Sequence, residues 1–151
     1  MNFKKTLANF LIAGSIFYGN VAKSESFIGS NITEDIRHTR SVKIDDMNND
    51  GYLDVVAGNE FTTNRIYLNN GTENPFESII GKDISSDAYH THGIDIGDVN
   101  NDGYLDVVTT GYLSGQHRLY LNNGTENPFN GVSGISIAGD SGSSSAIVLG
   151  D

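Results

Sequence analysis

A nine-residue stretch that is dense in side-chain oxygen atoms runs Asp46-Met47-Asn48-Asn49-Asp50-Gly51-Tyr52-Leu53-Asp54. Oxygen-bearing side chains occupy positions 1, 3, 5 and 9, and a glycine follows the third of them. Ca²⁺ takes about six to eight hard oxygen ligands, and a sharp turn at a glycine aims alternate side chains at one centre. The predicted ligands are the side chains of Asp46, Asn48, Asp50 and Asp54 and the carbonyl of Tyr52, with water completing the shell.

The same pattern returns as Asp98-Val99-Asn100-Asn101-Asp102-Gly103-Tyr104-Leu105-Asp106, at an offset of 98 − 46 = 52 residues. Its predicted ligands are Asp98, Asn100, Asp102, the Tyr104 carbonyl and Asp106. The alternative is a turn rich in Asp, Asn and Gly, since all three residue types favour turns. Three carboxylates so close together repel one another unless a cation lies among them. We therefore expect Ca²⁺ as the cofactor of both loops.

The residues around each loop indicate which kind of calcium site this is. An EF-hand needs a Glu at loop position 12 and helices on both sides, but position 12 is Ala57 in the first loop and Thr109 in the second. The segments after the loops, 53–58 and 105–110, are short and β-branched, which favours strands. Dockerin-like modules need helices there, and a calcium-binding β-roll needs a glycine-rich nonapeptide array.

The repeat extends well beyond the loops. Residues 65–76 match residues 118–129 at an offset of 118 − 65 = 53, with Asn70-Gly71 and Asn123-Gly124 as tight-turn signals between the third and fourth strands. Each repeat gives four strand signals, at about 41–45, 53–58, 65–69 and 76–84 in the first. Val42/Ile44 and Ile94/Ile96 suit an inner strand, and Ile66/Leu68 and Leu119/Leu121 would fill the space between repeats.

The fold class expected is therefore all-β: four-stranded antiparallel β-propeller blades, about two complete blades of a larger propeller, with calcium loops between strands 1 and 2. Residues 39–90 are the predicted first blade and residues 91–143 the second. Residues 23–38 would be an outer strand and loop belonging to a closing blade. Residues 144–151 would begin a truncated third repeat, since Ser145–Asp151 matches His92–Asp98. Two blades cannot close a ring, so further blades in cis or self-association are expected.

Residues 1–22 are typical of a secretory signal peptide, with Lys4 and Lys5 before an apolar run and small residues after it. An N-terminal core helix is the alternative. Export predicts a secreted, extracellular or periplasmic protein without membrane insertion after signal cleavage. The net charge of −10 makes nucleic acid a poor partner. The chain has no cysteine, so calcium and sheet packing must stabilise it.

Together these motifs resemble the VCBS and FG-GAP-type repeats of secreted proteins, which are related to the blades of integrin α-subunit propellers. The resemblance covers about residues 27–151 and rests on D-x-N-x-D-G-x-x-D, an apolar strand and Tyr-Leu-Asn-Asn-Gly. It implies a propeller with calcium in the loop between the first two strands of a blade, and a role in adhesion, carbohydrate binding or scaffolding. A clear Phe-Gly…Gly-Ala-Pro string is missing, so integrin-like ligand recognition is not implied.

Catalytic motifs are scarce in this sequence, and we expect no enzyme activity. His90 and His92, with His38 as a repeat counterpart, could bind a transition metal, could hydrogen-bond within loops leading into the innermost strands, or could meet a polar ligand there. Calcium accounts for the acidic residues of the loops, and Asp35 and Asp87 are repeat counterparts rather than a catalytic pair. The expected function is a secreted calcium-binding module with a carbohydrate or protein ligand. The alternative is an accessory or catalytic propeller segment of an exported polysaccharide-degrading enzyme.

Overall fold

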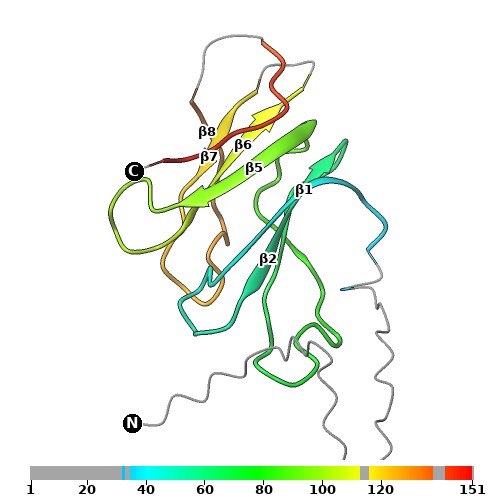
Figure 1. Ribbon diagram of the computed structural model, residues 1–151, viewed down its shortest axis with the longest axis vertical. Coiled ribbons are helices and arrows are strands. Elements are labelled where there is room, and N and C mark those ends of the chain that lie inside the picture. Colours follow the sequence, from blue (N-terminus) through cyan, green and yellow to red (C-terminus); the bar gives the residue numbers. More distant parts are fainter. Residues whose placement is uncertain (1–31, 33–34, 113–115, 138–141, 151) are drawn as a thin grey trace, which may run out of the picture. The chain divides into compact units, whose positions relative to one another are not determined.

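Two antiparallel sheets make up the computed structural model, which describes residue 32 and residues 35–112, 116–137 and 142–150. The described residues contain eight strands and no helix, in agreement with the all-β prediction (Figure 1). The first sheet consists of β1 (His38–Asp45), β2 (Asp54–Glu60), β3 (Arg65–Tyr67) and β4 (Lys82–Asp83), in that order. The second consists of β5 (Thr91–Gly97), β6 (Asp106–Gly111), β7 (Arg118–Tyr120) and β8 (Ile135–Ser136). Nothing helical in this described part has the length and apolarity to span a bilayer.

The two sheets have the same strand order and the same irregularity. Their first hairpins lose register at equivalent places, between Thr39 and Ser41 in the first sheet and between Thr91 and Gly93 in the second. Every residue of β2 and β6 is buried, which suits their Val-rich sequences. Two four-stranded antiparallel sheets of this kind fit β-propeller blades.

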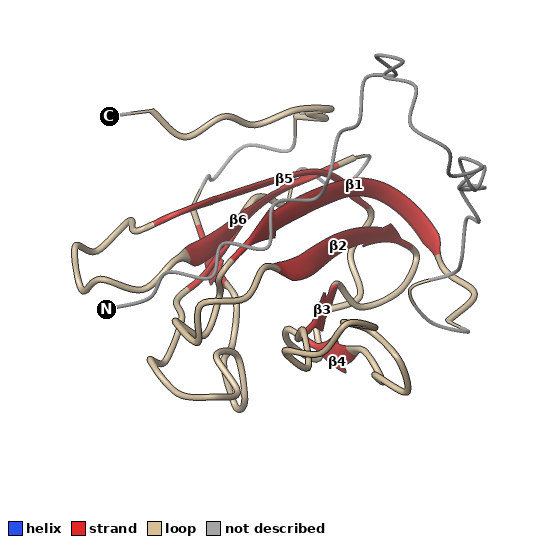
Figure 2. Ribbon diagram, turned by 60° about the horizontal axis from the view of Figure 1, so that its bottom comes forward, coloured by secondary structure: helices blue, strands red, loops and turns tan. Residues whose placement is uncertain are grey.

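One hydrophobic core joins the two sheets. It contains Met47, Val56, Ile66 and Ile84 from the first repeat and Ile94, Val107, Tyr120 and Phe129 from the second. Figure 2 shows β1 and β5 running side by side. Ile66 lies in the core between the repeats, as the sequence predicted.

The opposite face of the first sheet has a smaller buried cluster of Val55, Ala57 and Tyr67, but its inner strand is exposed. Val42 and Ile44 pair with Ala57 and Val55, so these four side chains share that face. Val42 is 49% exposed and Ile44 57% exposed, whereas Ile94, the counterpart of Val42, is 2% exposed. The same inner-strand position is therefore covered in the second repeat and open in the first.

The fourth strands are present, but they are much shorter than the sequence predicted. β4 and β8 have two residues each, and residues 76–80 form turns and irregular backbone rather than the start of a strand. Asn70-Gly71 does not join β3 to β4 by a tight turn, because residues 68–81 separate the two strands. The Asn70 backbone amide donates to the Pro75 carbonyl and its side-chain amide to the Asn74 carbonyl, so Asn70 closes a wider polar loop.

The C-terminal segment lies along the second sheet. The Ser144 amide donates to the Gly111 carbonyl over 3.2 Å, and the Leu149 amide donates to Asp95 Oδ2 over 2.6 Å. A comparable contact joins the first two repeats, where the Ile94 amide donates to Ser41 Oγ over 3.3 Å. The alignment of this segment with the start of a third repeat stays a prediction. The predicted signal peptide, residues 1–22, and most of the segment 23–38 that was expected to be an outer strand and loop lie outside the described residues.

Candidate metal loops and the opposite strand ends

The two predicted metal loops, here loop 1 (Asp46–Asp54) and loop 2 (Asp98–Asp106), connect the first two strands of each sheet. Both loops have left-handed backbone at their fourth and sixth positions: φ is 58° at Asn49, 90° at Gly51, 59° at Asn101 and 89° at Gly103. Asn and Gly tolerate this conformation better than other residues. The sequence of each loop therefore permits two changes of chain direction within a few residues.

In loop 1 the carboxylates accept hydrogen bonds from the loop's own backbone. Asp46 accepts from the amide of Asp50 through Oδ1 at 3.0 Å and from that of Gly51 through Oδ2 at 2.7 Å. Asn48 Oδ1 accepts from the Asp50 amide at 3.2 Å, and Asp50 Oδ1 accepts from the Tyr52 amide at 2.9 Å. These bonds place the first three predicted side-chain ligands around one turn.

The fourth predicted ligand of loop 1, Asp54, is fully buried at 0% exposure. Its two oxygens accept from the backbone amides of Met47 at 3.0 Å and Asn69 at 2.8 Å. Burial raises the pKa of Asp54, while the two hydrogen bonds lower it by less. The charges of Asp50 and Asp46 raise it further. Three carboxylates of loop 1 are therefore close enough to repel one another.

Loop 2 repeats this arrangement bond for bond. Asp98 accepts from the amides of Asp102 at 3.0 Å and Gly103 at 2.8 Å. Asp106, also at 0% exposure, accepts from the amides of Val99 at 3.0 Å and Asn122 at 2.8 Å. Burial raises its pKa too, with the charges of Asp102 and Asp98 adding to the rise. The remaining predicted ligands of loop 2 are Asn100 and Tyr104, and they bond to Asp102 as Asn48 and Tyr52 bond to Asp50.

The side chains of each loop fit a hard cation in type. Carboxylate and amide oxygens are the donors that Ca²⁺ takes. Within the described residues, however, no group of three or more His, Cys, Asp or Glu side chains is arranged to hold a metal ion. In each loop an amide NH₂ also points at a carboxylate: Asn48 Nδ2 lies 2.9 Å from Asp50 Oδ2, and Asn100 Nδ2 lies 2.8 Å from Asp102 Oδ2. A cation at the loop would have to replace these bonds.

The surroundings of the two loops differ. Met47 is 1% exposed within the core between the sheets, while its counterpart Val99 is 44% exposed. The Asn122 side-chain amide donates to the Met47 carbonyl over 2.8 Å, and Asn49 Nδ2 donates to the Gly103 carbonyl over 3.3 Å. Loop 1 is thus held by the second repeat.

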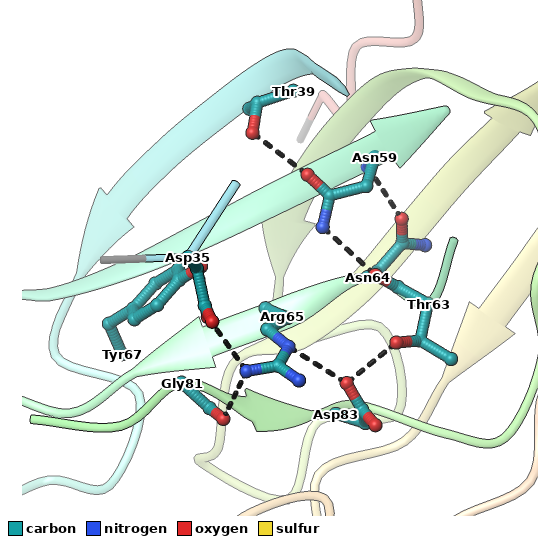
Figure 3. Close-up of polar contacts among 9 residues, drawn as sticks. All are labelled: Asp35, Thr39, Asn59, Thr63, Asn64, Arg65, Tyr67, Gly81 and Asp83. Atoms are coloured by element: carbon teal, nitrogen blue, oxygen red, sulfur yellow. Dashed lines mark hydrogen bonds and ion pairs between the residues drawn. The ribbon is translucent and has the colours of Figure 1, made fainter. Parts of the chain in front are cut away.

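Asp35 and Asp87, which the sequence analysis set aside as repeat counterparts, belong to polar networks at the outer strands. Figure 3 shows Arg65 donating to Asp35, to Asp83 and to the Gly81 carbonyl. The Tyr67 hydroxyl lies 3.2 Å from Asp35 Oδ2, and the Tyr120 hydroxyl 3.5 Å from Asp87 Oδ2. Each Asp therefore ties the chain before an inner strand to the third strand of the same repeat.

The histidines considered from sequence lie at the strand ends opposite the loops. His38 begins β1, and its partner across the sheet is Glu60 at the end of β2. The Phe61 ring contacts His90, with ring centroids 4.1 Å apart, and the centroid of His38 lies 6.5 Å from that of Phe61. His92 stacks instead on the ring of Tyr112, with the ring centroids 4.5 Å apart, so His90 and His92 contact different rings.

Sequence reasoning missed three residues that join this group: Glu60, Phe61 and Tyr112. Glu60 Oε2 accepts from Arg40 Nη2 at 2.6 Å and Nε at 2.9 Å, and Glu60 Oε1 lies 3.4 Å from His92 Nε2. We call the set Arg40, Glu60, Phe61, His90, His92 and Tyr112 the aromatic patch. A break in the repeat could have revealed it, since at offset 52 Arg40 aligns with His92 and Glu60 with Tyr112.

The fold and the duplicated loops define a repeat protein built of four-stranded antiparallel sheets. A family model described as the FG-GAP-like repeat matches residues 46–109 and again residues 98–151. The chain belongs to this FG-GAP-like repeat family. A search of curated proteins found no match.

Proposed function

We propose that this chain is an exported calcium-binding module of the β-propeller type that binds a carbohydrate or protein ligand and has no catalytic activity of its own. The observation that carries the calcium assignment is the duplicated loop, in which three carboxylates and an Asn surround one turn twice over with the same hydrogen bonds. Loops 1 and 2 would hold one Ca²⁺ each.

Electrostatic repulsion supports a cation over a simple turn. Asp46 and Asp50 both act to raise the pKa of the buried Asp54, so the apo loop holds its charges at a cost. A divalent cation would remove that repulsion. Mg²⁺ should substitute poorly, because it demands an octahedral shell at about 2.0–2.1 Å.

Calorimetric titration of the protein with Ca²⁺ tests the assignment, and two sites per chain are expected. Binding to the native state alone adds about 2.7 kcal/mol per site at a hundredfold excess over Kd, so EDTA should lower the melting temperature clearly.

Asp50→Ala and Asp102→Ala should each abolish one site. Asn49→Gly and Asn101→Gly are the matched controls, since these exposed side chains are not predicted ligands and glycine keeps the left-handed backbone at both positions. A melt that EDTA leaves unchanged, or equal loss of calcium in all four variants, would refute the proposal.

A role for further blades, in cis or from another copy, is supported by the exposed inner strand of the first sheet. Val42 and Ile44 are exposed there, whereas the first sheet covers the equivalent Ile94 of the second repeat. Repeat units bury their apolar faces against neighbours. Residues 23–151 expressed alone should assemble or aggregate, and light scattering should show it. A monodisperse monomer that melts cooperatively at micromolar concentration would contradict this part of the proposal.

A further inference from the structure

The residues of the aromatic patch contact one another in a ring that includes both repeats. Phe61 packs on His90, and the His90 carbonyl accepts from the Tyr112 amide at 2.9 Å. Tyr112 stacks on His92, and His92 returns to Glu60, the neighbour of Phe61 in sequence. The patch therefore depends on the end of β2, the start of β5 and the end of β6 meeting at one place (Figure 1).

This is also where the repeat is broken. The loops at the other strand ends match residue for residue in their ligands, but here Arg40 and Glu60 of the first repeat correspond to His92 and Tyr112 of the second. The contacts of the patch join unlike residues from the two repeats: Glu60 with His92, and Phe61 with His90. A function that needs one ligand site rather than a repeated one would occupy such a position.

Several features of the patch are costly unless they serve binding. Phe61 is 59% exposed and Tyr112 39% exposed, so two rings face solvent at one end of the sheets. Phe61 has φ of 66°, a left-handed conformation that bulky residues rarely adopt and that is concentrated at functional sites. His90 Nδ1 and Thr62 Oγ1 are buried, and neither has a hydrogen-bond partner among the described residues.

The charges of the patch narrow the ligand chemistry. Glu60 carries a negative charge because its hydrogen bonds from Arg40, opposed only in part by burial, hold its pKa below the usual value. The positive charge of Arg40 offsets the negative charge of Glu60, so the patch does not attract a cationic ligand. The chain's net charge of −10 disfavours an anionic ligand. The Arg40 side chain is 52% exposed and can donate to hydroxyl groups, whereas the Glu60 side chain is 10% exposed and already contacts Arg40 and His92, so Glu60 holds Arg40 in position.

From this combination we propose that the aromatic patch binds a neutral saccharide, whose pyranose rings lay their C–H faces on Phe61 and Tyr112 and whose hydroxyl groups bond to Arg40, which Glu60 holds in position. A saccharide has both an apolar ring face and a polar edge, and the patch offers exposed rings beside a fixed ion pair. This inference rests on the proposed function, because it names the ligand of the proposed binding module.

The test is titration calorimetry of calcium-saturated protein with a panel of neutral sugars (glucose, galactose, mannose, fucose, N-acetylglucosamine and their β-linked oligomers), with sialic acid as the anionic member and an aromatic peptide as the protein-like one. One or more neutral sugars should bind. Phe61→Ala, Tyr112→Ala and Arg40→Gln should each weaken that binding at least tenfold. The matched control is Ile80→Ala, which removes an exposed apolar side chain outside the patch and should leave binding unchanged.

A measurement on the unsubstituted protein guards against variants that fail to fold. In NMR spectra, the sugar should shift the ring signals of Phe61, Tyr112 and His92 and leave those of Tyr52 and Tyr104, which lie in the loops, in place. The proposal is overturned by shifts confined to the loops, by binding of only sialic acid or the peptide, or by no binding to any sugar. Calcium stoichiometry measured on the same samples distinguishes the two proposals. A protein that binds sugar but takes up no Ca²⁺ would refute the loop assignment alone.

Discussion

Met47 is buried between the sheets, and Val99, at the same position of the other metal loop, is exposed. Inside the loops no such difference exists: the backbone angles agree within a degree, and the carboxylates accept from the same amides. The nine residues of each loop therefore determine its conformation, while the packing of the neighbouring repeat determines how deeply the loop is buried. The opposite strand ends differ from the loops, because the aromatic patch brings together unlike residues of the two repeats, Glu60 with His92 and Phe61 with His90.

The largest effect is expected from Asp54→Ala and Asp106→Ala measured in EDTA. Each substitution removes a buried acceptor of two backbone amides and leaves both amides unpaired, at about 1–3 kcal/mol each. The loss in unfolding free energy should be greater at Asp54, since the Met47 amide that it accepts from belongs to a core residue. Urea denaturation of both variants measures it.

Asp50→Ala and Asp102→Ala are the controls for this experiment. Both carboxylates are exposed, so in EDTA these variants should unfold much like the unsubstituted protein and lose only the stabilisation by Ca²⁺. Losses below about 1 kcal/mol for Asp54→Ala would mean that relief of charge repulsion cancels the lost hydrogen bonds.

A pH titration compares the two sheets at Tyr120 and its counterpart Tyr67. Burial, and next the charge of Asp87, raise the pKa of Tyr120 to about 12, and burial with Asp35 raises that of Tyr67. The folded protein therefore keeps the Tyr120 proton to higher pH than the unfolded chain, whose tyrosines lose it near about pH 10. Stability should be fully present below that pH and fall by about 1.4 kcal/mol per unit between about pH 10 and 12.

Tyr120→Phe should flatten this alkaline loss, and Tyr67→Phe should flatten it less, because Tyr120 lies in the core between the sheets and Tyr67 in the smaller cluster of the first sheet. Urea unfolding at a series of pH values from 8 upward measures both. Parallel curves for the two variants would show that the second sheet shields its tyrosine no better than the first.

Asn122 and Asn69 isolate the hydrogen bond between the repeats. Each side-chain amide donates within its own sheet over 3.0 Å, Asn122 to the Leu105 carbonyl and Asn69 to the Leu53 carbonyl, but Asn122 donates to the Met47 carbonyl as well. Asn122→Ala should therefore cost about 1–2 kcal/mol more than Asn69→Ala in urea unfolding. Equal losses would mean that the Met47 carbonyl finds water when Asn122 is removed.

The sequence was sufficient for features that recur with a fixed offset. The loops, the inner strands and the place of Ile66 between the sheets all follow from local patterns that appear twice. The outer strands were overestimated because apolar residues such as Phe76 and Ile79 suggested a strand, whereas they pack onto the first sheet from a looped segment. The clustering of Glu60 with His92 could not be predicted, since it arises from packing between repeats and the alignment shows only that these positions differ.

The smallest effect is expected from Gly51→Ala and Gly103→Ala, and it tests the independence of the loops most directly. A Cβ built on either glycine meets no described atom within 4 Å, so strain at φ of 90° and 89° is the only cost, about 1–2 kcal/mol. Because the strain is local, the two losses in urea unfolding should agree within error. Gly71→Ala and Gly124→Ala provide the contrast, since there the added carbon meets the rings of Tyr52 and Tyr104 at 2.9 and 2.8 Å and the losses should be larger. Unequal losses for Gly51 and Gly103 would mean that the contact of loop 1 with the second repeat reaches its backbone, and that the nine residues alone do not determine the shape of the loop.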